Sequence, residues 1–199
     1  MIENIANECR MPLCYGGGIK TIEQALRIFN LGVEKIAISS LAVENPTIIN
    51  ELSKRVGSQS IVVVLDVKKK IFGDKYDLFI HNGTKKIEIN FVEFAVKMQD
   101  LGAGEIILNS IDNDGMMAGF NTSIIKKMTA VLKIPLTVLG GAGTMEDIGE
   151  LIKENGIIGI SAGSLFIFKG KYKAVLINYP TKLEKEQLFR KYFTSYWGK

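Results

Sequence analysis

Residues 135–164 read PLTVLGGAGTMEDIGELIKENGIIGISAGS and repeat the pattern of residues 12–40, which read PLCYGGGIKTIEQALRIFNLGVEKIAISS. Each copy is an apolar run, a glycine-rich turn, an amphipathic helix and a second apolar run that ends in small hydroxyl residues. This order is typical of a βαβ unit with glycine and serine at the carboxyl ends of its strands, where such folds bind ligands. Glycines there let backbone N–H groups approach a phosphate, and the dipole of the following helix favours an anion. Two copies therefore indicate a ligand with a phosphate at each end.

The rest of the chain continues the alternation of strands and helices. Nearly continuous apolar runs, typical of strands buried on both faces, predict strands at 12–16, 35–39, 60–66, 104–110, 135–139 and 157–161. Amphipathic patterns predict helices at 2–10, 21–31, 46–56, 91–101, 121–132 and 144–154. Alternation along the whole chain predicts the α/β class with a parallel sheet.

The spacing of the repeat favours a closed barrel over an open doubly wound sheet, which gives no reason for a repeat. Four predicted strands separate the start of one copy from the start of the next, and a twofold repeat of four closes at eight, as in the (β/α)8 TIM barrel. Pro12 and Pro135 lie 123 residues apart, so two periods need about 246 residues, close to the roughly 250 of such barrels. We therefore expect residues 1–199 to form a single incomplete TIM-barrel domain of the half-barrel-repeat type that lacks its first two strands.

Two further segments fall outside the alternation. Residues 68–90 predict a β-hairpin insertion with Asn82-Gly83 as its turn. An insertion after a strand end usually helps to form or cover a site. A helix is expected at about 180–194, near the end of the chain.

Composition excludes several classes of function. The net charge is +4 with lysines spread along the chain, which argues against nucleic-acid binding and suits a polyanionic small molecule. Cys9 and Cys14, with one histidine in the chain, argue against a zinc site and for a reducing compartment, and we expect neither metal nor cofactor. No apolar stretch is long enough to span a membrane and no signal peptide is evident, so the expected location is the cytoplasm.

Three aspartates are candidates for acid–base chemistry. Asp66 ends the run IVVVLDV, so its carboxylate is expected at the barrel mouth, where substrates bind; the alternatives are a helix cap or an ion pair with Lys68. Asp112 and Asp114 follow the strand at 104–110 in NSIDNDGMMAG, where one of them is a candidate for a second acid or base and the alternative is turn chemistry. A calcium loop is discounted because the spaced glutamate is absent.

The glycines and serines of the repeat are candidate phosphate ligands. Taken singly, they equally fit tight turns and helix caps, and the pairing of the two copies strengthens the functional interpretation. His81, in the predicted hairpin, has no identifiable partner and is expected to be a surface residue. Lys35 and Glu105 begin their strands, so we expect them at the amino-terminal end of the barrel, where charged residues face solvent or cap the barrel.

Six stretches together resemble the cyclase subunit of imidazole glycerol phosphate synthase, the HisF family: GGGIKTIEQAL, EKIAISSLAVENP, GSQSIVVVLDVK, GAGEIILNSIDNDG, LGGAGTMED and SAGSLF. They cover residues 1 to about 168 in the order and spacing of the family. The resemblance implies a heterodimer with a HisH-like glutaminase, whose ammonia passes through the barrel. It also implies a reaction in histidine biosynthesis that converts a ribulosyl bisphosphate to imidazole glycerol phosphate and an aminoimidazole ribonucleotide.

The resemblance also assigns roles to residues. Asp66 matches a catalytic aspartate and Asp114 an acid that lines the mouth, whereas Lys35 and Glu105 match half of a charged gate in the ammonia passage. The family's other catalytic aspartate lies on a first strand, which would precede residue 1. The matched phosphate-binding residues are Gly17, Gly18, Ser39 and Ser40 for one site and Gly140, Gly141, Gly163 and Ser164 for the other.

The C-terminal stretch and the predicted hairpin resemble a second branch of HisF-like proteins. FKGKYKAVLINYPTKLEKEQLFRKYF and HNGTKK are similar to a HisF-like branch associated with sugar amidation in surface polysaccharide (O-antigen) biosynthesis, in which the barrel passes ammonia to a separate sugar amidotransferase. Three functions therefore remain open: an ammonia-using cyclase, an ammonia-delivering subunit, and an inactive phosphate-binding fragment.

Overall fold

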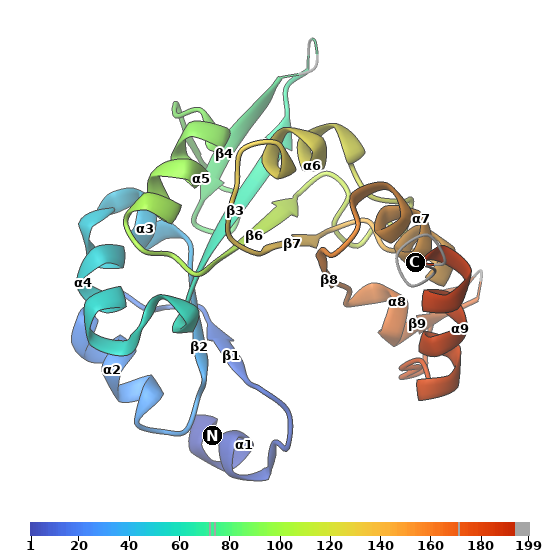
Figure 1. Ribbon diagram of the computed structural model, residues 1–199, viewed down its shortest axis with the longest axis horizontal. Coiled ribbons are helices and arrows are strands. Elements are labelled where there is room, and N and C mark those ends of the chain that lie inside the picture. The colour runs from blue at the N-terminus through green and yellow to red at the C-terminus, as the bar shows by residue number, and fades with distance from the viewer. Residues whose placement is uncertain (72, 74, 171, 194–199) are drawn as a thin grey trace. The chain divides into compact units, whose positions relative to one another are not determined.

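The computed structural model describes residues 1–71, 73, 75–170 and 172–193. Within this part of the chain, strands and helices alternate as the sequence predicts (Figure 1). The chain divides into two compact units. The first is Met1–Ile107 with Val131–Pro135, and the second is Leu108–Ala130 with Leu136–Lys199.

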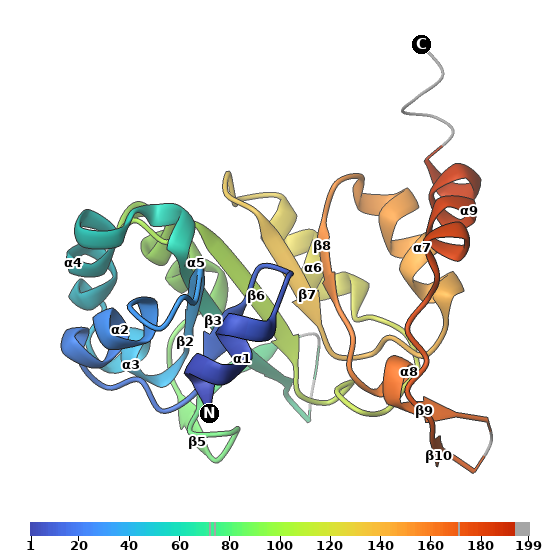
Figure 2. The ribbon, with the colours of Figure 1, turned by 90° about the horizontal axis from the view of Figure 1, so that it is seen from below.

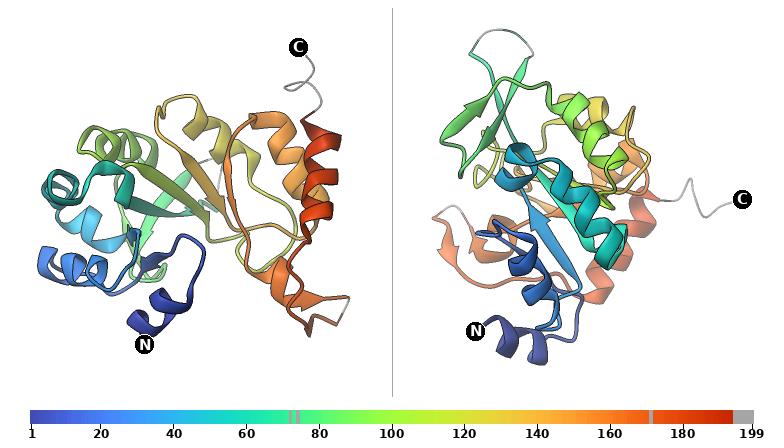
Figure 3. Two further views of the ribbon diagram at one scale, coloured as in Figure 1. Left: turned by 60° about the horizontal axis from the view of Figure 1, so that its bottom comes forward. Right: turned by 90° about the vertical axis from the view of Figure 1, so that its left-hand side faces the viewer.

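The first unit is built on parallel strands in the order β1 (Cys14–Gly16), β2 (Lys35–Ile38) and β3 (Ile61–Lys69), followed by the start of β6 (Glu105–Ser110). The register places Tyr15 beside Ile36, and Ile36 beside Ile61. Its helices are α1 (Ile2–Glu8), α2 (Ile22–Phe29), α3 (Ser40–Glu44), α4 (Thr47–Val56) and α5 (Phe91–Asp100), with a 3-10 turn at Ser58–Ser60. Helices α2, α3 and α4 lie together beside β2 and β3 (Figures 2 and 3).

The burial of side chains along β3 divides the strand into a core region and an accessible end. Ile61, Val63 and Leu65 are fully buried, because helices cover the sheet, whereas Lys68 is exposed. Asp66, between these two regions, is half-buried. The apolar run therefore fixes the strand in the core and places Asp66 towards its carboxyl end, but β3 continues to Lys69, so the expected strand end at residue 66 is wrong.

The predicted insertion is confirmed as a hairpin, with one change. Strands β4 (Tyr76–Ile80) and β5 (Lys85–Ile87) pair antiparallel across the predicted turn, in which the central residues Asn82 and Gly83 have φ of 57° and 75° and the amide of Thr84 donates to the His81 carbonyl at 3.3 Å. Positive φ at both residues is the geometry of the tight turns that match strand twist. The change concerns β3, which runs on to Lys69 and pairs with β4, so the insertion forms a three-stranded antiparallel ribbon.

The second unit contains the end of β6, then β7 (Leu136–Leu139) and β8 (Gly159–Ser161) in parallel. Its helices are α6 (Thr122–Thr129), α7 (Met145–Asn155), α8 (Ser164–Ile167) and α9 (Lys182–Tyr192), and a small ribbon pairs β9 (Phe168–Lys169) with β10 (Ala174–Val175). Helix α9 packs against α7 (Figure 3) through a core of Ile148, Ile152 and Leu188.

The α/β class with parallel strands is confirmed within each unit. The eight-stranded barrel, the two strands before residue 1 and the single domain remain predictions. The helix expected at 21–31 ends earlier, at Phe29, because the amide of Gly32 turns back to the carbonyl of Phe29. The helix expected at 180–194 begins at Lys182, and residue 194 lies outside the described residues. Among the helices of the described residues, none has the length and apolarity needed to cross a bilayer.

Candidate functional site

A cavity of about 690 Å³ lies at the carboxyl ends of the strands of the first unit. Its walls come from the turn after β1, from the β2–α3 junction, from the end of β3 and from the hairpin turn. The predicted site residues Gly17, Gly18, Ser39, Ser40 and Asp66 all line it. Residues from three separate segments of sequence therefore meet at the edge of the sheet where parallel α/β folds bind ligands.

The first glycine turn is open. Gly17 and Gly18 have φ of +109° and +71°, and a Cβ on either would meet nothing within 4 Å. Glycine is therefore required by the backbone conformation and not by crowding, and the open space lets a ligand approach the main chain. The start of α2 is capped by its own side chains: Thr21 Oγ1 accepts the amide of Gln24 at 3.2 Å, and Gln24 Oε1 accepts the amide of Lys20 at 2.8 Å. The glycine turn is thus a better candidate anion-binding site than the start of α2.

The two serines of this cavity link its walls. Ser39 Oγ donates to Asp66 Oδ2 at 3.4 Å, and Ser40 Oγ accepts the backbone N–H of His81 at 3.1 Å. Ser39 occupies the N-cap position of α3 without a capping hydrogen bond, so its hydroxyl does not serve as a helix cap. Among the described residues Lys68 forms no ion pair, so the alternative that pairs it with Asp66 is wrong.

His81 has a partner that the sequence did not reveal. Its Nε2 lies 3.1 Å from Glu44 Oε1, and both side chains are about half exposed. The expectation of a surface position is confirmed, but the imidazole and the backbone N–H of His81 both fix the hairpin turn to the α3 segment. The two partners are distant in sequence, and no local motif connects them.

Lys35 and Glu105 lie at the other end of the strands, as predicted. Each is the first residue of its strand, and Lys35 Nζ lies 2.6 Å from Glu105 Oε2. The Glu105 side chain is only 15% exposed, so its charge is compensated by the lysine in a partly desolvated position.

The second glycine turn differs from the first because it is packed against protein. Gly140 and Gly141 have φ of +89° and +124°. A Cβ on Gly140 would lie 2.6 Å from the carbonyl oxygen of Ser110, and one on Gly141 would collide with the carbonyl oxygen of Gly119. The amide of Gly119 also donates to the Gly141 carbonyl at 2.9 Å. Here glycine permits close packing against the loop that follows β6.

That loop carries Asp114 and is organised by other residues. The amides of Asn113 and Asp114 both donate to the Ser110 carbonyl at 3.0 Å. Ser110 Oγ donates to Asn113 Oδ1 at 2.8 Å, and Asn113 Nδ2 donates to the Gly119 carbonyl at 3.2 Å. Ser110 and Asn113 thus supply side-chain bonds that hold the turn, and Asp114 is exposed beside Gly140.

The start of α7 is occupied by a carboxylate of the chain itself. Asp147 Oδ2 accepts the amides of Gly143 at 2.9 Å and Thr144 at 2.8 Å, which completes a capping box with Thr144. The amides of Gly143, Thr144 and Asp147 are therefore already used. Gly163 and Ser164 lie at the start of α8, after β8, and a Cβ on Gly163 would meet open space.

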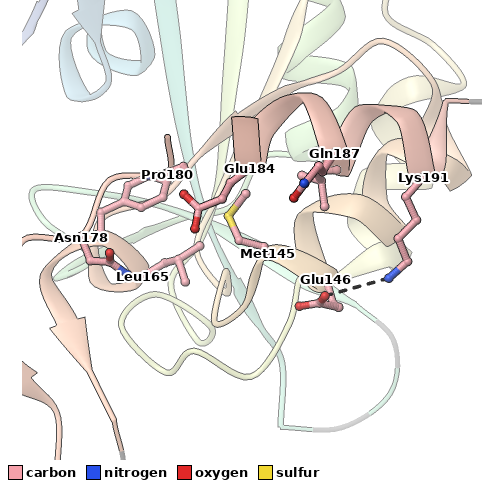
Figure 4. Close-up of a pocket in the computed structure, with 10 residues that line it drawn as sticks. Met145, Glu146, Leu165, Asn178, Pro180, Glu184, Gln187 and Lys191 are labelled. Carbon is pink, nitrogen blue, oxygen red and sulfur yellow. Dashed lines mark ion pairs between the residues drawn. The ribbon is translucent and has the colours of Figure 1, made fainter. Parts of the chain in front are cut away.

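A second cavity, of about 340 Å³, lies in the second unit between α7, α8 and α9 (Figure 4). Its charged groups already have partners: Glu184 accepts the amide and hydroxyl of Thr181 at 2.7 and 2.8 Å, and Lys191 Nζ lies 4.0 Å from Glu146 Oε1. We interpret it as a packing crevice at the docked C-terminal helix.

Comparisons with known proteins show which family this chain belongs to. A family model described as histidine biosynthesis protein matches residues 1–173. A relative from Vibrio vulnificus (strain YJ016), provisionally named an imidazole glycerol phosphate synthase subunit of the HisF type, is 60% identical over 187 residues, which are 94% of this chain and 72% of the relative. A relative with the same provisional name from Leptospira borgpetersenii is 57% identical over 95% of this chain and 74% of its own length. The imidazole glycerol phosphate synthase subunit HisF of Petrotoga mobilis is 42% identical over 74% of this chain and 58% of its own length.

Proposed function

The chain belongs to the histidine biosynthesis protein family, and on that premise we propose that it is the synthase (cyclase) subunit of a glutamine amidotransferase of the imidazole glycerol phosphate synthase type. In this proposal ammonia from a glutaminase partner reacts with a ribulosyl bisphosphate. The products are imidazole glycerol phosphate and an aminoimidazole ribonucleotide.

The observation that carries the proposal is the cavity of the first unit. Asp66 stands in its wall with Ser39 Oγ at 3.4 Å, and the open glycine turn of Gly17 and Gly18 lines the same space. A carboxylate beside a phosphate-binding turn can move protons on a substrate whose phosphate is held by backbone amides. We assign Asp66 the role of general acid or base, which typically contributes about 10²- to 10⁴-fold to rate.

We assign the phosphate groups of the substrate to the two glycine turns, one in each unit. Gly17, Gly18, Ser39 and Ser40 supply the ligands in the first unit, and Gly140, Gly141, Gly163 and Ser164 supply them in the second. Asp114 is proposed as the acid of the second unit, because its side chain is exposed beside Gly140 and is not needed for the turn.

We propose that the Lys35–Glu105 pair marks the entry for ammonia and the docking side of a HisH-like glutaminase. The pair lies at the amino ends of β2 and β6, opposite the cavity, and the half-buried position of Glu105 suits a gate more than a solvated surface. The remaining elements of the proposal are an eight-stranded barrel in the complete assembly and a cytoplasmic location, which the free Cys9 and Cys14 support.

One observation favours a second candidate function. His81 and Asn82, from the stretch that resembles the sugar-amidation branch, line the same cavity as Asp66. In that candidate function the chain delivers ammonia to a separate sugar amidotransferase and does not close an imidazole ring itself.

The deciding experiment is turnover of the ribulosyl bisphosphate with ammonium salts, with product identified by mass spectrometry. The cyclase proposal expects imidazole glycerol phosphate from the wild-type chain and a loss of about 10²-fold or more in Asp66→Asn. Asp100→Asn, at the exposed end of α5, is the matched control and should retain the rate. Wild-type turnover no faster than that of Asp66→Asn would remove the cyclase assignment and leave ammonia delivery.

A further inference from the structure

The pleat of the ribbon β3–β4–β5 divides its side chains between two faces. Paired residues on neighbouring strands point to the same side, and successive residues point to opposite sides. The register pairs Asp66 with Phe79, Lys68 with Asp77, and Phe79 with Lys86. One face, which we call the Asp66 face, therefore carries Asp66, Lys68, Asp77, Phe79 and Lys86.

Most charges of the Asp66 face are fixed around Asp77. Its carboxylate lies 3.0 Å from Lys70 Nζ and 3.2 Å from Lys86 Nζ, and its side chain is only 17% exposed. Burial acts to raise the pKa of Asp77, but hydrogen bonds and charges from the two lysines together outweigh it and lower the pKa below the ordinary value. Asp77 is thus ionised and holds two ammonium groups in place, with positive charge in excess.

Lys68 is a cation of this face that no described residue neutralises. It is exposed, and it makes no side-chain hydrogen bond or ion pair with any other residue that the structure describes. It lies two residues beyond Asp66 on the same face, about 7 Å along the strand, a separation that a lysine side chain can span. Lys68 therefore lies on the same face as an aspartate that lines the cavity, and no described residue pairs with its ammonium.

The cavity itself is short of positive charge for a phosphate ligand. Among its lining residues, Lys20 carries one positive charge, whereas Glu44 and Asp66 carry two negative charges. The imidazole of His81 contacts Glu44. A phosphate entering this space would meet more negative than positive side chains, which disfavours binding unless cations stand nearby. The Asp66 face provides such cations.

We propose that Lys68 is a substrate-binding residue that contacts an anionic group of the ligand held beside Asp66, while Lys70 and Lys86 raise the local concentration of that ligand electrostatically. The inference rests on the proposed function and deepens it by naming a further residue that binds the sugar bisphosphate. An acidic protein surface would also fit a basic face, but the continuity of this face with Asp66 favours the small ligand.

The test is calorimetric titration of the full chain with ribulose bisphosphate as the probe, at several ionic strengths. Lys68→Gln is compared with Lys85→Gln, which removes the same charge from the same ribbon. Lys85 pairs with Ile80 and so belongs to the opposite face, and it is also exposed. The expected result is about tenfold weaker binding and a flatter salt dependence for Lys68→Gln, with wild-type behaviour for Lys85→Gln.

The outcomes separate the two levels of the proposal. Wild-type binding of the probe with no difference between Lys68→Gln and Lys85→Gln overturns the role of Lys68 and leaves the proposed function standing. No binding by the wild-type chain, with a melting curve that shows it folded, refutes the proposed function and the inference together. Unchanged probe binding with loss of glutaminase capture by Lys68→Gln would assign the face to a protein partner and overturn the inference.

Discussion

Ser40 Oγ accepts the backbone N–H of His81 at 3.1 Å, which fixes the turn of the inserted hairpin to the wall of the first cavity. The imidazole of His81 adds a second link, to Glu44. The hairpin is thus part of the cavity wall through its turn, and the face of its strands continues from Asp66.

Ser40→Ala should loosen this turn without unfolding the first unit. Loss of one hydrogen bond of about 1 kcal/mol should speed hydrogen exchange at the amide of His81 by roughly fivefold. Ser40→Thr, which keeps an Oγ acceptor, should restore the slow exchange. Equal exchange rates in the wild type and Ser40→Ala, measured by mass spectrometry of the 76–87 segment, would argue that the contact does not hold the turn.

Gly17→Ala and Gly140→Ala should differ in their effect on stability. Both force a side chain into a positive-φ conformation, at a cost of about 1–2 kcal/mol. Only Gly140→Ala also drives a Cβ against the Ser110 carbonyl, so its loss of free energy of unfolding should be the larger, by about 1 kcal/mol or more. Urea denaturation measures both, and equal losses would contradict the packing difference between the two turns.

Gly17→Ala, the variant with the smaller expected loss of stability, should weaken phosphate binding in the first unit. Gly17→Ala fills the open side of its turn, so it should weaken binding of inorganic phosphate there although the chain stays folded. Phosphate titration followed by the shift of the melting temperature checks this expectation. Undiminished stabilisation of Gly17→Ala by phosphate would place the anion elsewhere.

The location of the first cavity could be predicted from sequence because it depends on topology alone. Gly17, Ser39 and Asp66 each end or follow an apolar run, and parallel strands bring such positions to one edge. The contact of His81 with Glu44 could not be predicted, because it depends on where the hairpin folds back against α3. The occupied start of α7 had a local signal, since Thr144 and Asp147 have the spacing of a capping box.

The position of Lys68 could be predicted from the sequence only in part. The sequence shows a lysine two residues after Asp66 and an Asn-Gly turn, but the assignment of Lys68 to the Asp66 face needs the pairing register. A one-residue slip would move Asp77 and Lys86 to the other side of the ribbon. Hairpin existence is local information, whereas register is set by packing of Leu78 and Ile80 into the core.

The Lys35–Glu105 pair should be coupled energetically. Each single change, Lys35→Met or Glu105→Gln, should lower the free energy of unfolding by on the order of 1 kcal/mol, more for Lys35→Met because it takes an ion-pair partner from the less exposed carboxylate. The double variant should lose less than the sum of the two. Additive losses in denaturant titrations would show that the 2.6 Å contact contributes no coupling.

Acid should weaken the wild type more than Asp77→Asn. The folded state lowers the pKa of Asp77, so this carboxylate adds stability above its ordinary pKa, and the contribution is lost as pH falls through the lowered value. The difference in free energy of unfolding between the wild type and Asp77→Asn should therefore stay constant above about pH 5 and shrink as pH falls through the lowered pKa of Asp77. Asp100→Asn, in which no lysine pair is removed, serves as the control, and a difference independent of pH would contradict the assignment.

The docking of α9 on α7 depends on Gly149. A Cβ at this position would collide with the ring of Tyr192, although alanine in a helix interior is intrinsically favoured over glycine by about 1 kcal/mol. Gly149→Ala should therefore destabilise the second unit, whereas the same change in a Tyr192→Ala background should stabilise it, because the collision is gone and the helix propensity remains. Thermal melts of the four variants in the cycle measure this reversal of sign. Stabilisation by Gly149→Ala in both backgrounds would mean that the Tyr192 ring does not rest on this face of α7.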